Sequence, residues 1–297
     1  MQAGKLTTER RNRATENLDR MSSLELVTAM NREDTLVPRA VAKVLPEIAR
    51  AVDLVAERLG RGGRLIYVGS GTSGRIGALD ASECAPTFGV STKMVQFVIA
   101  GGERALVVAT EASEDSVEMG RRDMAARRPG KRDVVVGLAA SGYTPYTISA
   151  LAYARSKGAA AIAVAFNRNS AIGKAADLCI ETEVGPEVLA GSSRLKAGTA
   201  EKLICNMLTT GAMTRLGYVY SNLMVNMNLT NRKLLQRGMT ILEELTGVDR
   251  DTAAAVLEKA GRSLPLALVM LKTGRIKAES ARRLRQSKGN VRKAIEG

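Results

Sequence analysis

Residues 63–90 read GRLIYVGSGTSGRIGALDASECAPTFGV, and this stretch decides the fold. Its first part, residues 64–69, is a short apolar run of the kind that forms a buried strand. The run ends in the glycine-rich turn GSGTSG at residues 69–74, and a segment of helix length follows. A strand that passes through a glycine-rich turn into a helix is typical of parallel α/β folds.

Four further apolar runs follow the first one along the chain. They occupy residues 94–102, 133–142, 159–166 and 178–185, and segments long enough to form helices separate them. Strands that alternate with helices pair in parallel and are covered by those helices. The sequence therefore predicts an α/β fold, with a doubly wound, mainly parallel five-stranded sheet flanked by helices.

The two ends of the chain have a different pattern. Residues 37–59 carry apolar side chains at helical spacing, which contributes to an expected N-terminal helical extension over residues 1–50. After about Thr246 the pattern changes to short helical segments bounded by glycine or turn residues. We therefore expect the extension to be followed by a sheet domain at residues 51–240 and a small three-helix domain at residues 241–297.

The composition excludes several kinds of catalysis. The 297 residues include 44 Lys and Arg, 30 Asp and Glu, and no histidine, which gives a formal net charge of +14. Without histidine the chain has no Ser-His-Asp or Cys-His nucleophile system and no imidazole metal site. Proton transfer must therefore depend on Glu, Asp, Lys, Tyr or Cys, and we expect neither a metal nor a cofactor.

Cysteine usage and hydropathy bear on the compartment. Cys84, Cys179 and Cys205 are far apart and odd in number, which is typical of a reducing compartment. Residues 1–20 lack the apolar core of a secretory signal, and no apolar run reaches the length of a transmembrane helix. We therefore expect a cytoplasmic protein that does not bind a membrane.

Part of the positive charge is concentrated in residues 275–297, which contain eight Lys or Arg and two Glu, a net charge of +6. A basic tail of this kind can bind nucleic acid. No Tyr or Phe accompanies the charge, so the tail offers no surface on which bases could stack. We favour a solvated helical face and expect no nucleic-acid partner.

Two turns rich in hydroxyl groups favour a phosphorylated ligand. The turn at 69–74 matches the G-x-G-x-x-G dinucleotide pattern, but the second predicted strand lacks the acidic residue that holds a ribose. The turn at 140–145, ASGYTP, also follows a strand and opens a helix. Backbone N–H groups at a helix start, together with Ser and Thr hydroxyls, form a neutral cradle for phosphate. The alternative is that these hydroxyls only cap the helices.

Two glutamates are candidates for acid–base chemistry. Glu83 lies in a stretch of small and apolar residues about one helix beyond the first turn. Glu114 and Asp115 follow Ser113, where the simpler interpretation is a capped helix start whose acids favour the helix dipole. In a chain without histidine, however, a pair of carboxylates is the natural acid–base apparatus.

A polar, glycine-rich segment at residues 185–199 leads into another predicted helix. It contains Glu187, Ser192, Arg194 and Lys196, and its two cations can attract an anion. These residues leave two interpretations open, a ligand-binding loop or a contact between domains or subunits.

The ordered set of motifs resembles a known family. The stretches that carry the resemblance are residues 8–19, 63–90, 100–106, 133–146, 185–210 and 219–227. The two turns resemble those of the SIS (sugar isomerase) domain, a phosphosugar-binding α/β fold, and the whole set resembles the N-acetylmuramic acid 6-phosphate etherases along nearly the entire chain. The resemblance implies cleavage of the D-lactyl ether of that phosphosugar, by elimination from the ring-opened aldehyde and addition of water. The products would be N-acetylglucosamine 6-phosphate and D-lactate, which feed peptidoglycan recycling or amino-sugar catabolism.

The resemblance also implies roles for individual residues. Glu83 matches the proton donor of the family and Glu114 its second catalytic carboxylate, which we interpret as the acid on the lactyl oxygen and the base at C2. The expected substrate- and phosphate-binding residues are Ser70, Thr72, Ser73, Ser141, Gly142, Thr144, Glu187, Ser192 and Lys196. The family is dimeric, so we expect a homodimer whose ligand is a small phosphosugar.

Three rival functions remain at this point. A non-catalytic phosphosugar sensor of the same fold would bind without turnover, but the presence of both Glu83 and Glu114 argues against it. A transcription regulator would carry an N-terminal helix-turn-helix, and residues 1–50 lack a clear turn of that kind. A phosphosugar isomerase would also use a carboxylate base but would release no lactate.

Overall fold

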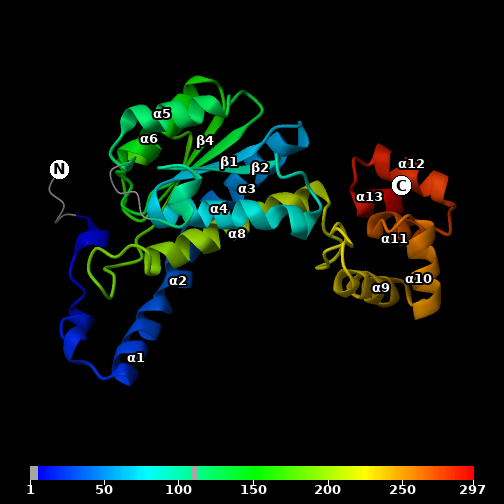
Figure 1. The fold of residues 1–297 in the computed structure, drawn as a ribbon, viewed down its shortest axis with the longest axis horizontal. Helices are drawn as coiled ribbons and strands as arrows, with labels where there is room; N and C mark the ends of the chain where they lie inside the picture. Colours follow the sequence, from blue (N-terminus) through cyan, green and yellow to red (C-terminus); the bar gives the residue numbers. More distant parts are fainter. Residues whose placement is uncertain (1–5, 109–112) are drawn as a thin grey trace. The chain divides into compact units, whose positions relative to one another are not determined.

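The computed structural model describes residues 6–108 and 113–297, and it contains a parallel sheet (Figure 1). Within these residues the sheet has five strands: β1 (Leu65–Gly69), β2 (Val95–Ile99), β3 (Val134–Leu138), β4 (Ala160–Ala165) and β5 (Leu178–Glu181). Their order is β2-β1-β3-β4-β5, and every neighbouring pair is parallel. Each strand falls within one of the five apolar runs, so the α/β fold class expected from the sequence is confirmed.

The position of β1 in the strand order creates a crevice at the carboxyl ends of the strands. Because β1 lies between β2 and β3, the chain runs outward from β1 on one side and crosses to the other side to form β3. Such a reversal of strand order leaves room for a ligand outside the carboxyl ends of the two strands. The turns at 69–74 and 140–145 directly follow β1 and β3. Both hydroxyl-rich turns therefore border the same crevice.

Helices cover both faces of the sheet, with α5 and α6 on one face and α3, α4 and α8 on the other (Figure 1). The described helices are α1 (Ser23–Asp34), α2 (Leu36–Ala42), α3 (Leu45–Gly60), α4 (Gly71–Phe88), α5 (Val117–Ala126), α6 (Pro145–Ser156), α7 (Ala171–Lys174), α8 (Lys196–Leu216), α9 (Arg232–Thr246), α10 (Arg250–Lys259), α11 (Leu264–Thr273), α12 (Lys277–Gln286) and α13 (Val291–Glu296), with 3-10 turns at Thr7–Glu9, Arg13–Thr15, Leu18–Arg20 and Glu103–Leu106. None of the described helices combines the length and the apolar character needed to cross a membrane.

The first face of the sheet forms a continuous apolar core with α5 and α6. Ile66 and Val68 of β1 are fully buried against side chains that include Met124 of α5, and Tyr146 and Leu151 of α6. Alternate residues of a strand point to opposite faces, so the neighbouring Leu65 and Tyr67, which are also buried, face α3, α4 and α8. A strand buried on both faces explains why the run at 64–69 is apolar throughout.

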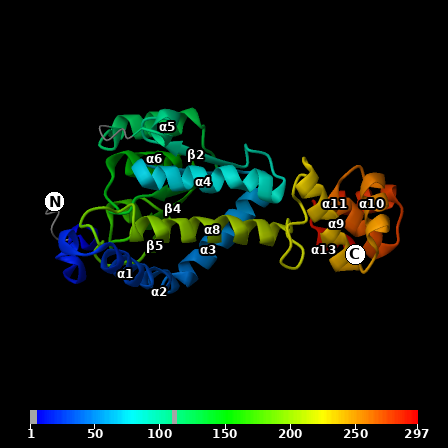
Figure 2. The ribbon, with the colours of Figure 1, turned by 60° about the horizontal axis from the view of Figure 1, so that its bottom comes forward.

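On the second face, α4 and α8 lie side by side (Figures 1 and 2). Helix α4 approaches β1 so closely that a Cβ atom on Gly77 would lie 2.8 Å from Cβ of Tyr67. Asp80 of α4 joins the layers, because its carboxylate accepts hydrogen bonds from the hydroxyl of Tyr67 at 2.9 Å and from Nδ2 of Asn206 at 2.7 Å. The helix that starts in the first turn is thus fixed firmly to both the sheet and α8.

The apolar pattern at residues 37–59 forms two helices, α2 and α3, although the sequence predicts one. The break falls at Lys43 and Val44, and Pro46 occupies the first turn of α3. Proline lacks a backbone N–H and disfavours helical backbone in the residue before it, so it is suited to begin a helix and not to continue one. Residues such as Ile48, Val55 and Leu59 are buried as expected.

The chain divides into two compact units, Met1–Ser82 with Thr92–Thr209, and Glu83–Ser91 with Thr210–Gly297. The three-part division at residues 1–50, 51–240 and 241–297 stays a prediction. In the second unit, Leu242, Leu257 and Leu268 belong to a separate apolar core.

The prediction of three helices after residue 241 is wrong. In the described chain, α10 to α13 follow the end of α9, because the last expected helix is divided between α12 and α13. The break lies at Lys288 and Gly289, which both have positive φ angles, 52° and 84°. Such left-handed backbone is typical of a helix end and cannot continue a right-handed helix.

Candidate functional site

A cavity of about 490 Å³ lies at the carboxyl ends of β1 and β3, and we call it the switch-point cavity. Its lining residues are Glu9, Ser70, Gly71, Thr72, Ser73, Arg75, Glu114, Leu138, Ala140, Ser141, Thr144, Ser193 and Arg194. All of them belong to the first unit. The cavity brings together six of the predicted site residues from the two turns and from the segment that precedes α5.

The first turn contributes a buried hydroxyl to the cavity wall. Ser70 is only 7% exposed, and its Oγ has no hydrogen-bond partner among the described residues. Buried hydroxyls are nearly always hydrogen-bonded in folded proteins, so an orphaned one in a cavity wall is suited to a bound polar group. Gly71 follows with a φ of 52°, which lets the backbone turn directly into α4.

A second serine of the same turn is held by a buried acid on α8. The Oγ of Ser73 donates a hydrogen bond of 2.6 Å to Oε1 of Glu201, and Glu201 is only 1% exposed. Burial raises the pKa of Glu201 to about 8, so this carboxyl is mostly neutral at pH 7. Glu201 is not among the site residues predicted from the sequence. The signal was its helical spacing to Ala197, Ile204 and Leu208, which places it on the buried face of α8.

The raised pKa of Glu201 makes the stability of the fold pH-dependent. Between its ordinary pKa of 4.5 and the folded value of about 8, the folded protein holds a proton that the unfolded chain releases. The contribution of Glu201 to the free energy of unfolding therefore falls as the pH rises through this window, by up to about 1.4 kcal/mol per pH unit. Glu201→Gln keeps an oxygen acceptor for Ser73 and has no proton to lose. As the pH rises from 5 to 8, we expect the free energy of unfolding to fall less in the variant than in the wild type, as measured by denaturant titration at each pH. An equal fall in both proteins would contradict the raised pKa of Glu201.

The second turn presents a threonine hydroxyl at the start of α6. Thr144 is the N-cap residue, yet among the described residues its side chain makes no capping hydrogen bond, which argues against the interpretation that it only caps the helix. Ser141 accepts the N–H of Tyr143 at 3.2 Å within the turn. Gly142 does not line the cavity: its N–H donates to the carbonyl of Ala139, and a Cβ atom on it would lie 2.4 Å from Cβ of Ser170. Its place in the turn is therefore one that only glycine can fill.

Glu114 lies between the two turns. Its Oε1 is so close to the first turn that a Cβ atom on Gly71 would approach it to 3.0 Å. Its carbonyl accepts the N–H of Tyr146 at 3.0 Å, which fixes it to the start of α6. Ser116 is the N-cap of α5 and accepts the N–H of Met119, so Glu114 lies outside that helix and does not cap it. Residues 109–112, which precede Ser113 in the chain, lie outside the described residues.

Glu83 is a predicted site residue that does not belong to the first unit. It is exposed on α4, three turns beyond the start of the helix, and it belongs to the second unit. Glu83 is not one of the described residues that line the switch-point cavity.

In the segment at residues 185–196, some side chains hold the start of α8 in place and others line the switch-point cavity. Glu187 is fully buried and accepts the N–H groups of Lys196 and Ala197, both at 2.9 Å, so it caps α8. The Nζ of Lys196 is buried in an ion pair with Glu33 of α1. Ser192 is half-buried next to Ser193, which does line the cavity together with Arg194. Of the residues that the sequence singled out in this segment, Arg194 lines the cavity, and Glu187, Ser192 and Lys196 do not.

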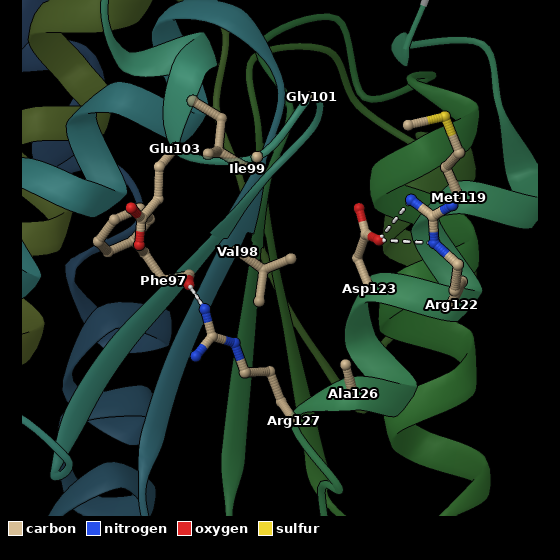
Figure 3. A pocket seen from close by; sticks show the side chains of 11 residues that line it. Phe97, Val98, Ile99, Gly101, Glu103, Met119, Arg122, Asp123, Ala126 and Arg127 are labelled. Carbon is tan, nitrogen blue, oxygen red and sulfur yellow. Dashed lines mark hydrogen bonds and ion pairs between the residues drawn. The ribbon is translucent and has the colours of Figure 1, made fainter.

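A second cavity, of about 420 Å³, lies between the edge strand β2 and α5 (Figure 3). Three of its charged side chains, Arg122, Asp123 and Arg127, already have partners. Asp123 accepts hydrogen bonds from Arg122 at 3.0 Å and from the hydroxyl of Tyr146 at 2.9 Å. Arg127 donates to the carbonyl of Phe97 at 3.2 Å. The switch-point cavity, with its orphaned hydroxyl and two glycine turns, is therefore the stronger candidate site.

Comparison with known proteins shows which family the chain belongs to. Residues 47–155 match the family described as the glucokinase regulatory protein N-terminal SIS domain, and residues 117–211 match the SIS domain family. The chain is 51% identical over 295 residues to the N-acetylmuramic acid 6-phosphate etherase of Oenococcus oeni, with 99% of each chain covered. It is 54% identical over 275 residues to the protein of the same name from Symbiobacterium thermophilum, with 92% of this chain and 91% of the other covered. A phosphoheptose isomerase from Francisella tularensis shares the fold, with a TM-score of 0.53 and 20% identity over 65% of this chain and all of the other.

Proposed function

The chain belongs to the N-acetylmuramic acid 6-phosphate etherase family, and we propose on that basis that it is a carbon–oxygen lyase acting on N-acetylmuramic acid 6-phosphate. The reaction cleaves the D-lactyl ether at C3 and yields N-acetylglucosamine 6-phosphate and D-lactate, in peptidoglycan recycling or amino-sugar catabolism. The observation that carries the proposal is the position of Glu114, whose carboxylate lines the same cavity as both hydroxyl turns.

The second turn is suited to bind the phosphate group. The hydroxyls of Ser141 and Thr144 line the cavity at the start of α6, where the helix dipole favours negative charge. The orphaned hydroxyl of Ser70 and that of Thr72 are available to the sugar. Arg75 and Arg194 add positive charge to the cavity wall, which offsets the charge of the phosphate and the lactyl carboxylate.

The reaction that we propose is an elimination followed by an addition. In the ring-opened sugar the C1 aldehyde acidifies the hydrogen at C2, and Glu114 removes this proton. The bond between C3 and the lactyl oxygen breaks, and Glu83 gives a proton to the leaving oxygen, because an alkoxide is a poor leaving group. Water then adds at C3 while a proton returns to C2. One water molecule is consumed for each D-lactate released. At the end of the full cycle, both carboxyl groups have returned to their starting protonation states.

We also propose that the protein is a cytoplasmic homodimer in which Glu83 acts on the substrate bound to the partner subunit. The exposure of Glu83 and its absence from the described lining of its own cavity support this arrangement. In a symmetric dimer, one such exchange completes both sites at once. Cys84, Cys179 and Cys205 form no disulfide with one another, which supports a reducing compartment.

A binding-only sensor is the rival function. Such a protein needs both hydroxyl turns to bind the phosphosugar. A carboxylate between the turns does not help it, because the negative charge lies close to the phosphate of a bound ligand and repels that phosphate. The presence of Glu114 in the cavity wall therefore favours the enzyme.

Isotope labelling tests the proposed course of the reaction. In deuterium oxide, the N-acetylglucosamine 6-phosphate formed is expected to carry deuterium at C2, because the proton removed by Glu114 exchanges with solvent before it returns. In oxygen-18 water, the label is expected at C3 of the sugar. Label in the hydroxyl of the lactate would mean that water attacks the lactyl carbon, which contradicts the elimination.

A further inference from the structure

The motif at residues 8–19 has no role in the reaction described so far, yet one of its residues lines the switch-point cavity. We infer that Glu9 is a substrate-binding residue, which accepts hydrogen bonds from hydroxyl or amide groups of the sugar. Residues 6–20, here called the N-terminal strap, bring it there. The inference rests on the proposed function for the identity of the ligand, and it adds a binding residue from a segment far from the sheet in sequence.

The strap is fixed to the second turn by one buried asparagine. Oδ1 of Asn167 accepts the N–H of Thr7 at 2.8 Å, and its Nδ2 donates to the hydroxyl of Thr8 at 3.2 Å. The same Nδ2 donates to the carbonyl of Ser141 at 3.1 Å. Asn167 and Thr8 are both almost fully buried, at 4% and 1% exposed. The residue before Glu9 is therefore held against the turn that we propose to bind phosphate.

Two more hydrogen bonds hold the other end of the strap on the segment that leads to α8. Nδ2 of Asn12 donates to the carbonyl of Pro186 at 3.1 Å, and the hydroxyl of Thr15 donates to the carbonyl of Val188 at 2.8 Å. Glu9 lies between these two sets of contacts. The strap is therefore anchored on both sides of Glu9.

The carboxylate of Glu9 is available to a ligand. Its Oε2 lies beside the 185–196 segment, where a Cβ atom on Gly191 would approach it to 3.5 Å. The hydrogen bond that it accepts from Thr8 is long, at 3.4 Å, and among the described residues Glu9 forms no ion pair. The side chain is exposed, so the strap does not need it for packing.

The chemistry of a carboxylate decides which part of the ligand it contacts. It accepts hydrogen bonds and repels anions, so the phosphate and the lactyl carboxylate are excluded as its partners. The remaining polar groups of the sugar include hydroxyls and the amide N–H, all of which donate. Glu9 therefore contributes to binding of the sugar and not to binding of a free phosphate ion.

Binding measurements on three variants test this inference. We expect Glu9→Ala to weaken binding of the product N-acetylglucosamine 6-phosphate by about 10-fold or more, the usual loss when a hydrogen bond to a charged acceptor is removed. Binding of inorganic phosphate is expected to stay within about twofold of the wild type, since the carboxylate of Glu9 only accepts hydrogen bonds and does not bind an anion. Glu9→Gln keeps one acceptor oxygen, so its affinity for N-acetylglucosamine 6-phosphate should lie between that of the wild type and that of Glu9→Ala. In turnover, the loss should be in KM more than in kcat.

Glu16→Gln is the matched control, because Glu16 is exposed on the same strap and does not line the switch-point cavity. It should behave as the wild type. Unchanged sugar binding in Glu9→Ala would overturn the inference. So would an equal loss of sugar and phosphate binding together with a lower melting temperature, because Glu9 would then serve only to hold the strap. Wild-type protein that binds the sugar phosphate but releases no D-lactate would overturn the proposed function and leave the test of Glu9 intact.

Discussion

Replacing Glu114 with glutamine is expected to lower D-lactate release by at least about 100-fold, the usual contribution of a positioned acid–base group. The amide keeps the size of the side chain and its place beside Gly71, but it cannot remove the proton at C2. We expect KM to change little, because the hydroxyl turns that bind the ligand remain. Steady-state assays of D-lactate at saturating substrate measure this effect directly.

The control for this variant is Glu118→Gln, which changes an exposed glutamate in the first turn of α5. It should keep full activity. Exchange of the C2 hydrogen of N-acetylglucosamine 6-phosphate in deuterium oxide should vanish in Glu114→Gln along with lactate release. If exchange persisted at the wild-type rate, another group would be the base and our assignment of Glu114 would be wrong.

Replacing Glu83 with alanine is expected to abolish D-lactate release while exchange of the C2 hydrogen continues. The reason is that Glu83 protonates the leaving oxygen and Glu114 acts alone at C2, so only the breaking of the C3 bond requires both. Proton NMR of the sugar in deuterium oxide follows exchange, and an enzymatic assay follows lactate. Loss of both signals from protein that still binds the sugar phosphate would contradict this division of roles.

Mixed dimers test whether Glu83 acts across the subunit contact. When inactive Glu83→Ala and Glu114→Ala subunits are combined at random, half of the dimers contain one of each, and one of the two sites in these dimers is intact. About a quarter of the wild-type activity should therefore return. If each site used both glutamates of one chain, every site in the mixture would lack one of them, and no activity would return.

The sheet and its two turns could be predicted from the sequence because their signals are local. A run such as residues 159–166 is apolar throughout, since β4 is buried on both faces, and glycine marks the turns after β1 and β3. Strands β2, β3 and β5 end several residues before the apolar runs that predict them, whereas β1 ends with its run. The turn after β3, for example, begins in alanines that are as apolar as the strand itself.

The candidate site was only partly predictable, because its other members come from distant parts of the chain. Glu9 reaches the cavity through contacts of the strap with Asn167, and nothing local in residues 6–20 indicates that position. Glu187 and Lys196 show the opposite case. A glycine-rich, charged loop is typical of ligand binding, but their charges are satisfied by the start of α8 and by Glu33. Which polar residues face a ligand depends on packing that sequence patterns do not contain.

The most direct test of the account is the release of D-lactate from purified N-acetylmuramic acid 6-phosphate by the wild-type protein. We expect one D-lactate for each N-acetylglucosamine 6-phosphate formed, and little or no release from N-acetylmuramic acid without the phosphate, because the second turn would then have no ligand. Folded wild-type protein that binds the phosphosugar and releases no D-lactate would contradict the account.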